Sequence, residues 1–449
     1  MATCLATILT PLMSTMMNLS LLSIGSEFGV GSHALAYVNT LFLLGSVVSM
    51  VPSAKYASIH GMKRVSLIGL SIVIVACILS MVSPGFYFLL IMRFVIGLGC
   101  AMLMVTSMAM ITYVFPLTVR GKMLGLNTTF VYIGLSLGPT IGGVLTDTLG
   151  WRSIFATILL MGAGAFLLMT RFRKEVVPTP GDGMDWMGSA MWGMMITVLM
   201  LGFINITEWW GPALTVLGFV LLFAVWRQLR ASGKPVLDVR MFHNRLFTRT
   251  CLAAFMNYGA SYCITFFLAL YLQSVGQMTA IEAGTLMLVQ PFIQVLLTMK
   301  MGALSDRMEN KRFLPFLGAV ITGIGVAMYL LVTTEFNMYL IIAIMITTGV
   351  GLGIFSAPNN SLIMSSVPNH LKGQASGMVA VVRQTGMMIS MSLAMASIAV
   401  MMGSMDNLSP ATFGTFVDAM HVTFAVCLGM CILSAVCSLS KIEAGYELS

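Results

Sequence analysis

The amino-acid sequence predicts an all-α membrane protein of fourteen transmembrane helices, arranged as two six-helix bundles plus two inserted spans. Of its 449 residues, 58% are hydrophobic and only 8% are charged, and the mean hydropathy is +0.96. So few charges exclude a soluble domain and indicate many membrane helices. The chain also divides into apolar runs of about 20 residues, which are long enough to cross a hydrocarbon core of about 30 Å, and it contains one internal repeat.

Taken in chain order, the apolar runs predict one helix each, separated by short polar connections. We expect these spans at residues 3–25, 35–56, 65–83, 86–112, 123–148, 152–171, 186–206, 212–228, 250–273, 280–303, 313–333, 336–358, 374–402 and 418–439.

The connections between the spans alternate in charge, and this alternation predicts their orientation. Basic residues mark cytoplasmic connections in membrane proteins. We therefore expect both termini in the cytoplasm and the protein in the plasma or inner membrane. The basic connections hold Lys55, Lys63, Arg64, Arg120, Lys122, Arg171, Arg173, Lys174, Arg227, Arg230, Lys234, Arg240, Arg245, Arg249, Lys300, Arg307, Lys311, Arg312, Lys372 and Lys441, whereas the opposite ones hold Glu27, Glu208, Glu335, Asp406 and a single base, Arg152.

The internal repeat relates the first six spans to the last six. Pro116, Arg120 and Gly121 recur 252 residues later as Pro368, Lys372 and Gly373, and a similar offset of 248 carries Lys63 and Arg64 onto Lys311 and Arg312. We therefore expect a first bundle at 1–174, two inserted spans with an interfacial linker at 175–249, and a second bundle at 250–449. Repeated six-helix units place a substrate site at their interface near the midplane, which opens to each side in turn.

A glycine stripe in the fifth span is the most distinctive local pattern. Gly134, Gly138 and Gly142 fall on one helix face, with Pro139 and Gly143 beside them. Small residues in such a stripe allow two membrane helices to approach closely, and the proline bends its helix. A plain packing interface is the alternative interpretation.

With this stripe the chain resembles the major facilitator superfamily, specifically its branch of 14-span drug/proton antiporters. The run from Gly134 to Gly143 is similar to the antiporter motif of the fifth span. Gly150, Trp151 and Arg152 after that span, and Arg383-Gln384-Thr385-Gly386 in the thirteenth, also match this branch. The resemblance covers nearly the whole chain and implies a multidrug efflux function.

A second motif of the family lies in the loop after the tenth span. It implies a gating role for Gly302, Asp306, Arg307, Lys311 and Arg312. The Asp306 carboxylate would bond the positive N-terminus of a neighbouring helix. In the first half of the chain, Ala54 and Ser58 replace the glycine and aspartate of this motif.

Two arginines lie inside predicted spans, where a guanidinium is costly and by default functional. The family implies that Arg93 takes part in proton handling, and Arg383 lies at a similar depth from the other side. A structural role, as an ion pair or a cap on carbonyl groups, is the alternative for Arg93. The branch also commonly carries an aspartate in the first span, but Met13 stands in its place here. Glu282 and Asp147 are therefore the acids that we consider as substitutes for proton coupling.

Polar residues within the spans are candidates for lining a roomy, apolar substrate cavity. Each of them is equally well explained as an interhelical hydrogen-bonding group. These residues are Asn18, Asn127, Asn257, Tyr258, Tyr262, Gln290 and Gln384.

The sequence contains no phosphate-binding glycine loop, no metal-ligand spacing among its five histidines and eight cysteines, and no catalytic triad. We therefore expect no enzyme activity, no cofactor and no nucleic-acid partner, and we expect a monomer in the bilayer. Three functions stay open: export of amphiphilic, drug-like molecules in exchange for protons, uncoupled transport of an anionic or neutral metabolite, and a sensor that does not transport.

Overall fold

The computed structural model describes residues 2–30, 32–171, 175–179, 181–206, 208–402 and 412–439, and within them every regular element is a helix. In these ranges, 13 helices are long and apolar enough to span a membrane, and the shorter apolar helix Thr3–Met16 occupies the first predicted span. The fourteen predicted spans are thus all helical. Arg173, Lys174, Asp406 and Lys441, which we used to predict orientation, lie outside the described residues.

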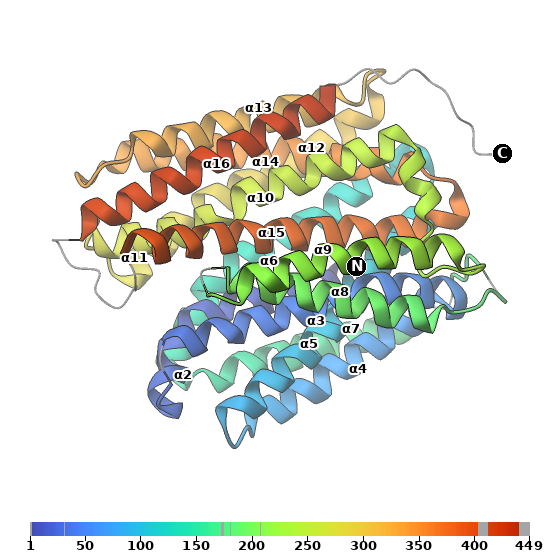
Figure 1. The fold of residues 1–449 in the computed structure, drawn as a ribbon, viewed down its shortest axis with the longest axis horizontal. Helices are drawn as coiled ribbons and strands as arrows, with labels where there is room; N and C mark the ends of the chain where they lie inside the picture. The colour runs from blue at the N-terminus through green and yellow to red at the C-terminus, as the bar shows by residue number, and fades with distance from the viewer. Residues whose placement is uncertain are drawn as a thin grey trace.

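The helices form two stacked bundles with a hairpin against one side (Figure 1). The first bundle contains α1 (Ala2–Met16), η1 (Met17–Ser20), α2 (Leu21–Phe28), α3 (Ser32–His60), α4 (Met62–Met81), α5 (Phe86–Val114), α6 (Leu117–Leu149) and α7 (Arg152–Arg171). The hairpin contains α8 (Trp186–Ile204) and α9 (Gly211–Ala231), followed by η2 (Val239–His243). The second bundle contains α10 (Arg245–Ser274), α11 (Ala280–Met287), α12 (Val289–Arg307), α13 (Phe313–Met328), η3 (Tyr329–Leu331), α14 (Met338–Ser365), η4 (Asn369–Leu371), α15 (Lys372–Met402) and α16 (Phe413–Leu439).

Two spans that we predicted as continuous helices are interrupted. In the tenth span, α11 ends at Met287 and α12 begins at Val289. Pro291 explains this break, because it lacks the N–H that would bond the carbonyl of Met287. In the first span, α1 gives way to the tighter turn η1 before the chain continues as α2, and Ser20 in this turn bonds Thr146 of α6 through their hydroxyl groups at 2.7 Å.

The two bundles meet along two seams that follow the internal repeat. In the first seam, α6 packs on α12, and a Cβ atom built on Gly125 would lie 3.3 Å from the carbonyl oxygen of Thr298. In the second, α15 packs on α3, and a Cβ atom on Gly377 would lie 3.4 Å from the carbonyl oxygen of Met50. Gly377 follows Gly125 by 252 residues and Thr298 follows Met50 by 248, so the same contact occurs once in each half.

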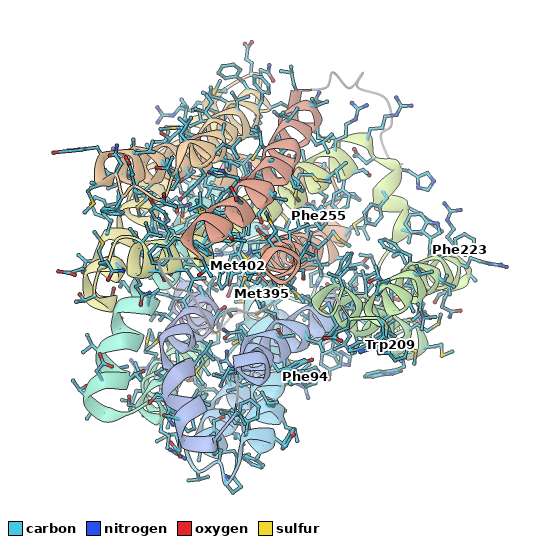
Figure 2. The ribbon with its side chains drawn as sticks, turned by 60° about the vertical axis from the view of Figure 1, so that its left-hand side comes forward. Phe94, Trp209, Phe223, Phe255, Met395 and Met402 are labelled. Carbon is cyan, nitrogen blue, oxygen red and sulfur yellow. The ribbon has the colours of Figure 1, made fainter. Side chains whose placement is uncertain are left out.

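The α8–α9 hairpin lies beside the second seam, where α8 contacts both α3 and α15. Its other face points away from the bundles: Trp209 is 89% exposed and Phe223 is 65% exposed (Figure 2). Large apolar side chains on an outer face are expected where helices contact lipid.

Candidate functional site

Arg93 is completely buried in α5, and backbone and amide oxygen atoms of its own bundle surround it. Its Nε donates to the carbonyl of Val38 at 3.0 Å, Nη1 to the carbonyl of Met13 at 3.4 Å, and Nη2 to Oδ1 of Asn39 at 3.1 Å. The guanidinium also lies 4.8 Å from the ring centroid of Phe42. Each of its three nitrogens therefore has an acceptor, so this geometry favours the carbonyl-capping interpretation, in which Arg93 ties α5 to α1 and α3.

The glycine stripe of α6 lies directly against the first span. A Cβ atom on Gly134 would lie 2.8 Å from Cγ of Pro11, and one on Gly138 would lie 1.8 Å from Oγ1 of Thr15. One on Gly142 would lie 2.4 Å from the carbonyl oxygen of Met16, where α1 ends. Any side chain at these positions would push the two helices apart. Pro139 and Gly143 lie inside α6 and are half-buried.

Asp306, at the end of α12, forms a hydrogen bond between the two bundles. Its Oδ2 accepts from the backbone N–H of Lys122 near the start of α6, at 3.3 Å. Gly302 is buried one turn earlier in α12, while Arg307 and Lys311 are exposed and Arg312 is half-buried. The aspartate of the motif therefore faces the partner bundle, and two of its three basic residues face outward.

The equivalent position in the first half has a different bonding pattern. Ser58 occupies the place of the aspartate, and a Cβ atom on Gly373 of α15 would lie 2.3 Å from its hydroxyl oxygen. Lys55, which is buried one turn earlier, pairs with Asp182 of the linker that leads to α8. This hydrogen bond from Lys55 holds the pKa of the Asp182 carboxyl below its usual range. The ion pair thus anchors the linker to the end of α3.

These contacts close one end of the bundle interface. We call it the basic end, because Lys311 lies in one of its connections and Lys63 and Lys372 lie among the first residues of the helices α4 and α15 that begin there. In addition to the Asp306 bond, Tyr113 of α5 donates its hydroxyl to the carbonyl of Asn369 in η4. Deeper along the interface, Ser376 of α15 donates to the carbonyl of Val105 in α5 at 3.2 Å. Side chains and backbone from both bundles therefore seal this end.

Nearer the middle of the membrane, a polar cluster joins five helices. Tyr132 of α6 hydrogen-bonds Ser356 of α14 through their hydroxyl groups. Tyr258 of α10 lies next to Tyr132, and Arg383 of α15 lies within electrostatic range of it. Nη2 of Arg383 is 3.2 Å from the thioether sulfur of Met104 in α5. The cluster therefore lies between the bundles, where the repeat predicts a substrate site.

The other predicted cavity residues are distributed around this cluster. Asn127 is buried and accepts a hydrogen bond from Thr7 at 3.0 Å, and Tyr262 bonds Ser14 of α1. Asn257 is completely buried, and neither atom of its side-chain amide has a partner in the described residues. Gln384 is buried and Gln290 is half-buried, whereas the side chain of Asn18 lies outside the described residues.

The two acids considered for proton coupling both lie at helix ends. Glu282 is exposed at the start of α11, where it forms a capping box with Thr279: the carboxylate accepts from that residue's N–H and hydroxyl, each at 2.9 Å. Asp147 is exposed near the end of α6. Among the described residues, the buried charged side chains are Lys55, Arg93 and Lys372, and no acid is buried.

Two features of the structure escaped the sequence analysis. The Lys55–Asp182 pair joins residues 127 positions apart, and no local pattern marks such a partner. At the opposite end of the first bundle, Arg152 pairs with Glu27 at 2.7 Å and donates to the carbonyl of Met81 at 3.1 Å, while Trp151 donates to the same carboxylate at 2.6 Å. The Arg152 bond lowers the pKa of Glu27. Trp151 and Arg152 therefore connect the start of α7 to the ends of α2 and α4.

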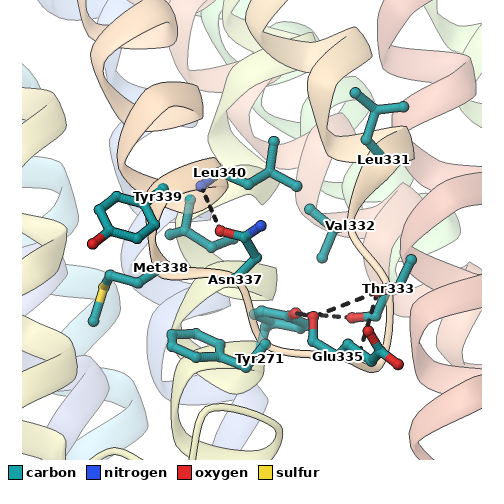
Figure 3. Close-up of a pocket in the computed structure, with 11 residues that line it drawn as sticks. Tyr271, Leu331, Val332, Thr333, Glu335, Asn337, Met338, Tyr339 and Leu340 are labelled. Atoms are coloured by element: carbon teal, nitrogen blue, oxygen red, sulfur yellow. Dashed lines mark hydrogen bonds between the residues drawn. The ribbon is translucent and has the colours of Figure 1, made fainter.

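A surface cavity of about 430 Å³ lies away from this cluster, at the end opposite the basic end (Figure 3). It lies around the connection between α13 and α14, and Tyr271 donates its hydroxyl to the carbonyl of Thr333 there at 2.8 Å. Within the part of the chain that the structure describes, no group of three metal-binding side chains could hold a metal ion.

Comparisons with known proteins agree with this architecture. A family model described as the Major Facilitator Superfamily matches residues 3–391. The riboflavin transporter RibZ of Clostridioides difficile (strain 630) is 28% identical over 386 residues, which cover 85% of this chain and 83% of RibZ. Multidrug resistance protein Stp of Mycobacterium tuberculosis (strain CDC 1551 / Oshkosh) is 27% identical over 382 residues, 82% of this chain and 70% of Stp.

Solved structures show the same fold at low sequence identity. The human organic anion transporter MFSD10 superposes with a TM-score of 0.68 at 15% identity, over 97% of this chain and 98% of that one. The proton:xylose symporter XylE superposes with a TM-score of 0.66 at 14% identity, over 97% and 93% of the two chains.

Proposed function

Because this chain belongs to the Major Facilitator Superfamily, we propose that it exports amphiphilic, drug-like small molecules in exchange for protons by alternating access. Members of the family are transporters and not enzymes, and this chain is accordingly a multi-pass membrane transporter of a small molecule. The basic end is its cytoplasmic end in this proposal. The names of relatives such as multidrug resistance protein Stp support the choice of substrate class.

The observation that carries the proposal is the closed seam between the bundles at the basic end. The Asp306 carboxylate bonds a backbone N–H of α6 there, and such a bond to a charged acceptor contributes about 1.5–3 kcal/mol. That is strong enough to bias a two-state equilibrium and weak enough to break in each cycle. Alternating access requires a reversible contact of this kind between two rocking units.

The glycine stripe supports the same mechanism from within the first bundle. Gly138 and Gly142 bring α6 onto the interrupted first span, against the side chain of Thr15 and the backbone of Met16. A close, smooth contact allows one helix to shift against another, and the break at η1 divides the first span into two pieces, α1 and α2.

The test is export from cells that produce the protein, with and without a protonophore. Two fluorescent amphiphiles are used, a lipophilic cation and a dye with a free carboxylate. Export that the protonophore abolishes supports proton exchange. If neither dye leaves the cells although the protein is in the membrane, the proposal of amphiphile export is wrong.

A second function, uncoupled transport of an anionic or neutral metabolite, is favoured by one observation. Proton-coupled transporters commonly use an ionisable acid within the membrane, and no acid is buried in the described residues. The relative RibZ bears the name of a riboflavin transporter. Export that continues at full rate in the presence of the protonophore would favour this second function over the first.

A further inference from the structure

The two arginines inside the membrane differ in what they bond. Arg93 is completely buried and has an oxygen acceptor at each of its three nitrogens. Arg383 is half-buried, and its one acceptor among the described residues is the thioether sulfur of Met104. A thioether is a weak acceptor, whereas a guanidinium has five N–H groups to donate. Arg383 therefore retains most of its hydrogen-bonding capacity.

The position of Arg383 makes this capacity available at the bundle interface. It lies eleven residues after the start of α15, or about 16 Å along the helix at 1.5 Å per residue, and thus near the middle of the membrane. Met104 contacts it from the first bundle, and Tyr132 of that bundle lies within electrostatic range of it. On its own bundle, a Cβ atom on Gly386, one turn later, would lie 3.4 Å from Cβ of Tyr258.

The surroundings of Arg383 combine aromatic rings, a thioether and hydroxyl groups, but no acid. Tyr132 and Tyr258 are buried aromatic residues of this cluster, of the kind that packs against planar apolar bodies, and methionine adapts to varied shapes. Arginine pairs with carboxylate and phosphate groups through two parallel hydrogen bonds. With no buried acid in the described part of the chain, this charge has no internal counter-ion there.

We propose that Arg383 binds the anionic head group of the transported molecule, so that the preferred substrates are amphiphiles with an aromatic body and a carboxylate, sulfonate or phosphate group. This inference rests on the proposed transport function and narrows its substrate class. Arg93 does not share the role, because it is completely buried and each of its nitrogens already donates to an oxygen of its own bundle. A lipophilic cation is a poor substrate in this arrangement, because the uncompensated guanidinium repels it.

The experiment separates binding from transport. Binding of a xanthene dye with a free carboxylate, and of a cationic xanthene dye with an esterified carboxyl group, is measured by fluorescence anisotropy on the purified full chain in detergent. Export of both dyes is measured in cells. We expect the wild type to bind the carboxylate dye at least tenfold more tightly than the cationic dye. Arg383→Gln should lose at least tenfold in affinity for the carboxylate dye, and Arg383→Lys should lose less.

Arg227→Gln is the matched control, because it removes an exposed charge from α9, outside the seam between the bundles. Its binding should equal that of the wild type. The inference is overturned if the wild type prefers the cationic dye, or if Arg383→Gln binds the carboxylate dye as tightly as the wild type does. Tight binding without export of either dye would instead contradict the transport function and leave the assignment of Arg383 supported.

Discussion

Asp306 and Lys122 are 184 positions apart in the chain, yet the carboxylate of the first accepts a hydrogen bond from the backbone N–H of the second. The bond joins α12 of the second bundle to α6 of the first at the basic end. Because the donor is a backbone group, the identity of the side chain at 122 matters little to it. The bond depends instead on where α6 begins and on the carboxylate that reaches it.

Removal of this carboxylate should open the basic end. Asp306→Ala is expected to lower the population closed at that end at least tenfold, which matches the loss of about 1.5–3 kcal/mol for a bond to a charged group. The measurement is the rate of disulfide formation between Tyr113→Cys and Asn369→Cys, which replace two residues of α5 and η4 that are in contact at the same basic end. Glu309→Ala, an exposed acid three residues further on, is the control and should leave the rate unchanged. An equal rate with and without Asp306 would show that the bond does not hold the seam.

Gly138→Leu should abolish transport and leave membrane insertion intact. Even a Cβ atom at this position would lie 1.8 Å from Oγ1 of Thr15, and overpacking of this kind costs about 1–3 kcal/mol. We expect export to fall at least tenfold while the amount of protein in the membrane stays within twofold of wild type. Gly164→Ala in α7 is the control, because nothing lies within 4 Å of its Cβ position. Normal export by Gly138→Leu would remove the glycine stripe from the mechanism.

Arg93→Gln should destabilise the first bundle, whereas Arg383→Gln should leave it stable. The Arg93 change removes the hydrogen bonds that this guanidinium donates to two carbonyl oxygens and to the amide oxygen of half-buried Asn39, and a hydrogen bond to a charged group contributes about 1.5–3 kcal/mol. We expect the midpoint of thermal unfolding in detergent to fall by several degrees for Arg93→Gln only. Equal midpoints for the two variants would contradict the structural role of Arg93.

Glu282→Ala should weaken α11 slightly without changing the response of transport to a protonophore. The change removes one half of the capping box at the start of α11, and the carboxylate already bonds Thr279 in the structure. When the rate of export is measured at increasing protonophore concentration, the curves of the variant and the wild type should coincide. A variant whose export no longer responds would make Glu282 a proton carrier after all.

The Lys55–Asp182 pair should stabilise the protein at neutral pH and lose its effect in acid. The folded-state pKa of Asp182 lies below its usual range because Lys55 bonds it, so the pair contributes fully above the ordinary aspartate pKa of about 3.9. Its contribution disappears as the pH falls through the lower folded-state value. The unfolding midpoint of Asp182→Asn should therefore lie below that of the wild type by a constant amount from pH 5 to pH 8, and the difference should begin to shrink below about pH 4. A difference that changes between pH 6 and pH 8 would rule out this explanation.

The spans were predictable because a membrane helix requires only sufficient length and apolarity. The internal repeat also predicted which connections of the first bundle are equivalent to which connections of the second. The break in the tenth span follows from Pro291, which length and apolarity alone do not reveal. The environments of the two arginines were not predictable, because the carbonyls of Val38 and Met13 become available to Arg93 only through packing. Residue spacing places Arg383 and Met104 on different helices and cannot show that they are in contact.

The α8–α9 hairpin has a consequence for molecules dissolved in the bilayer. It stands beside the α3–α15 seam, whereas α6 and α12 on the other side have no such neighbouring pair among the described helices. For a lipophilic molecule in the bilayer, the α8–α9 hairpin therefore covers the α3–α15 seam, whereas no such hairpin covers the α6–α12 seam among the described helices. The two seams accordingly differ in their exposure to the bilayer, although the two bundles are built on the same repeat.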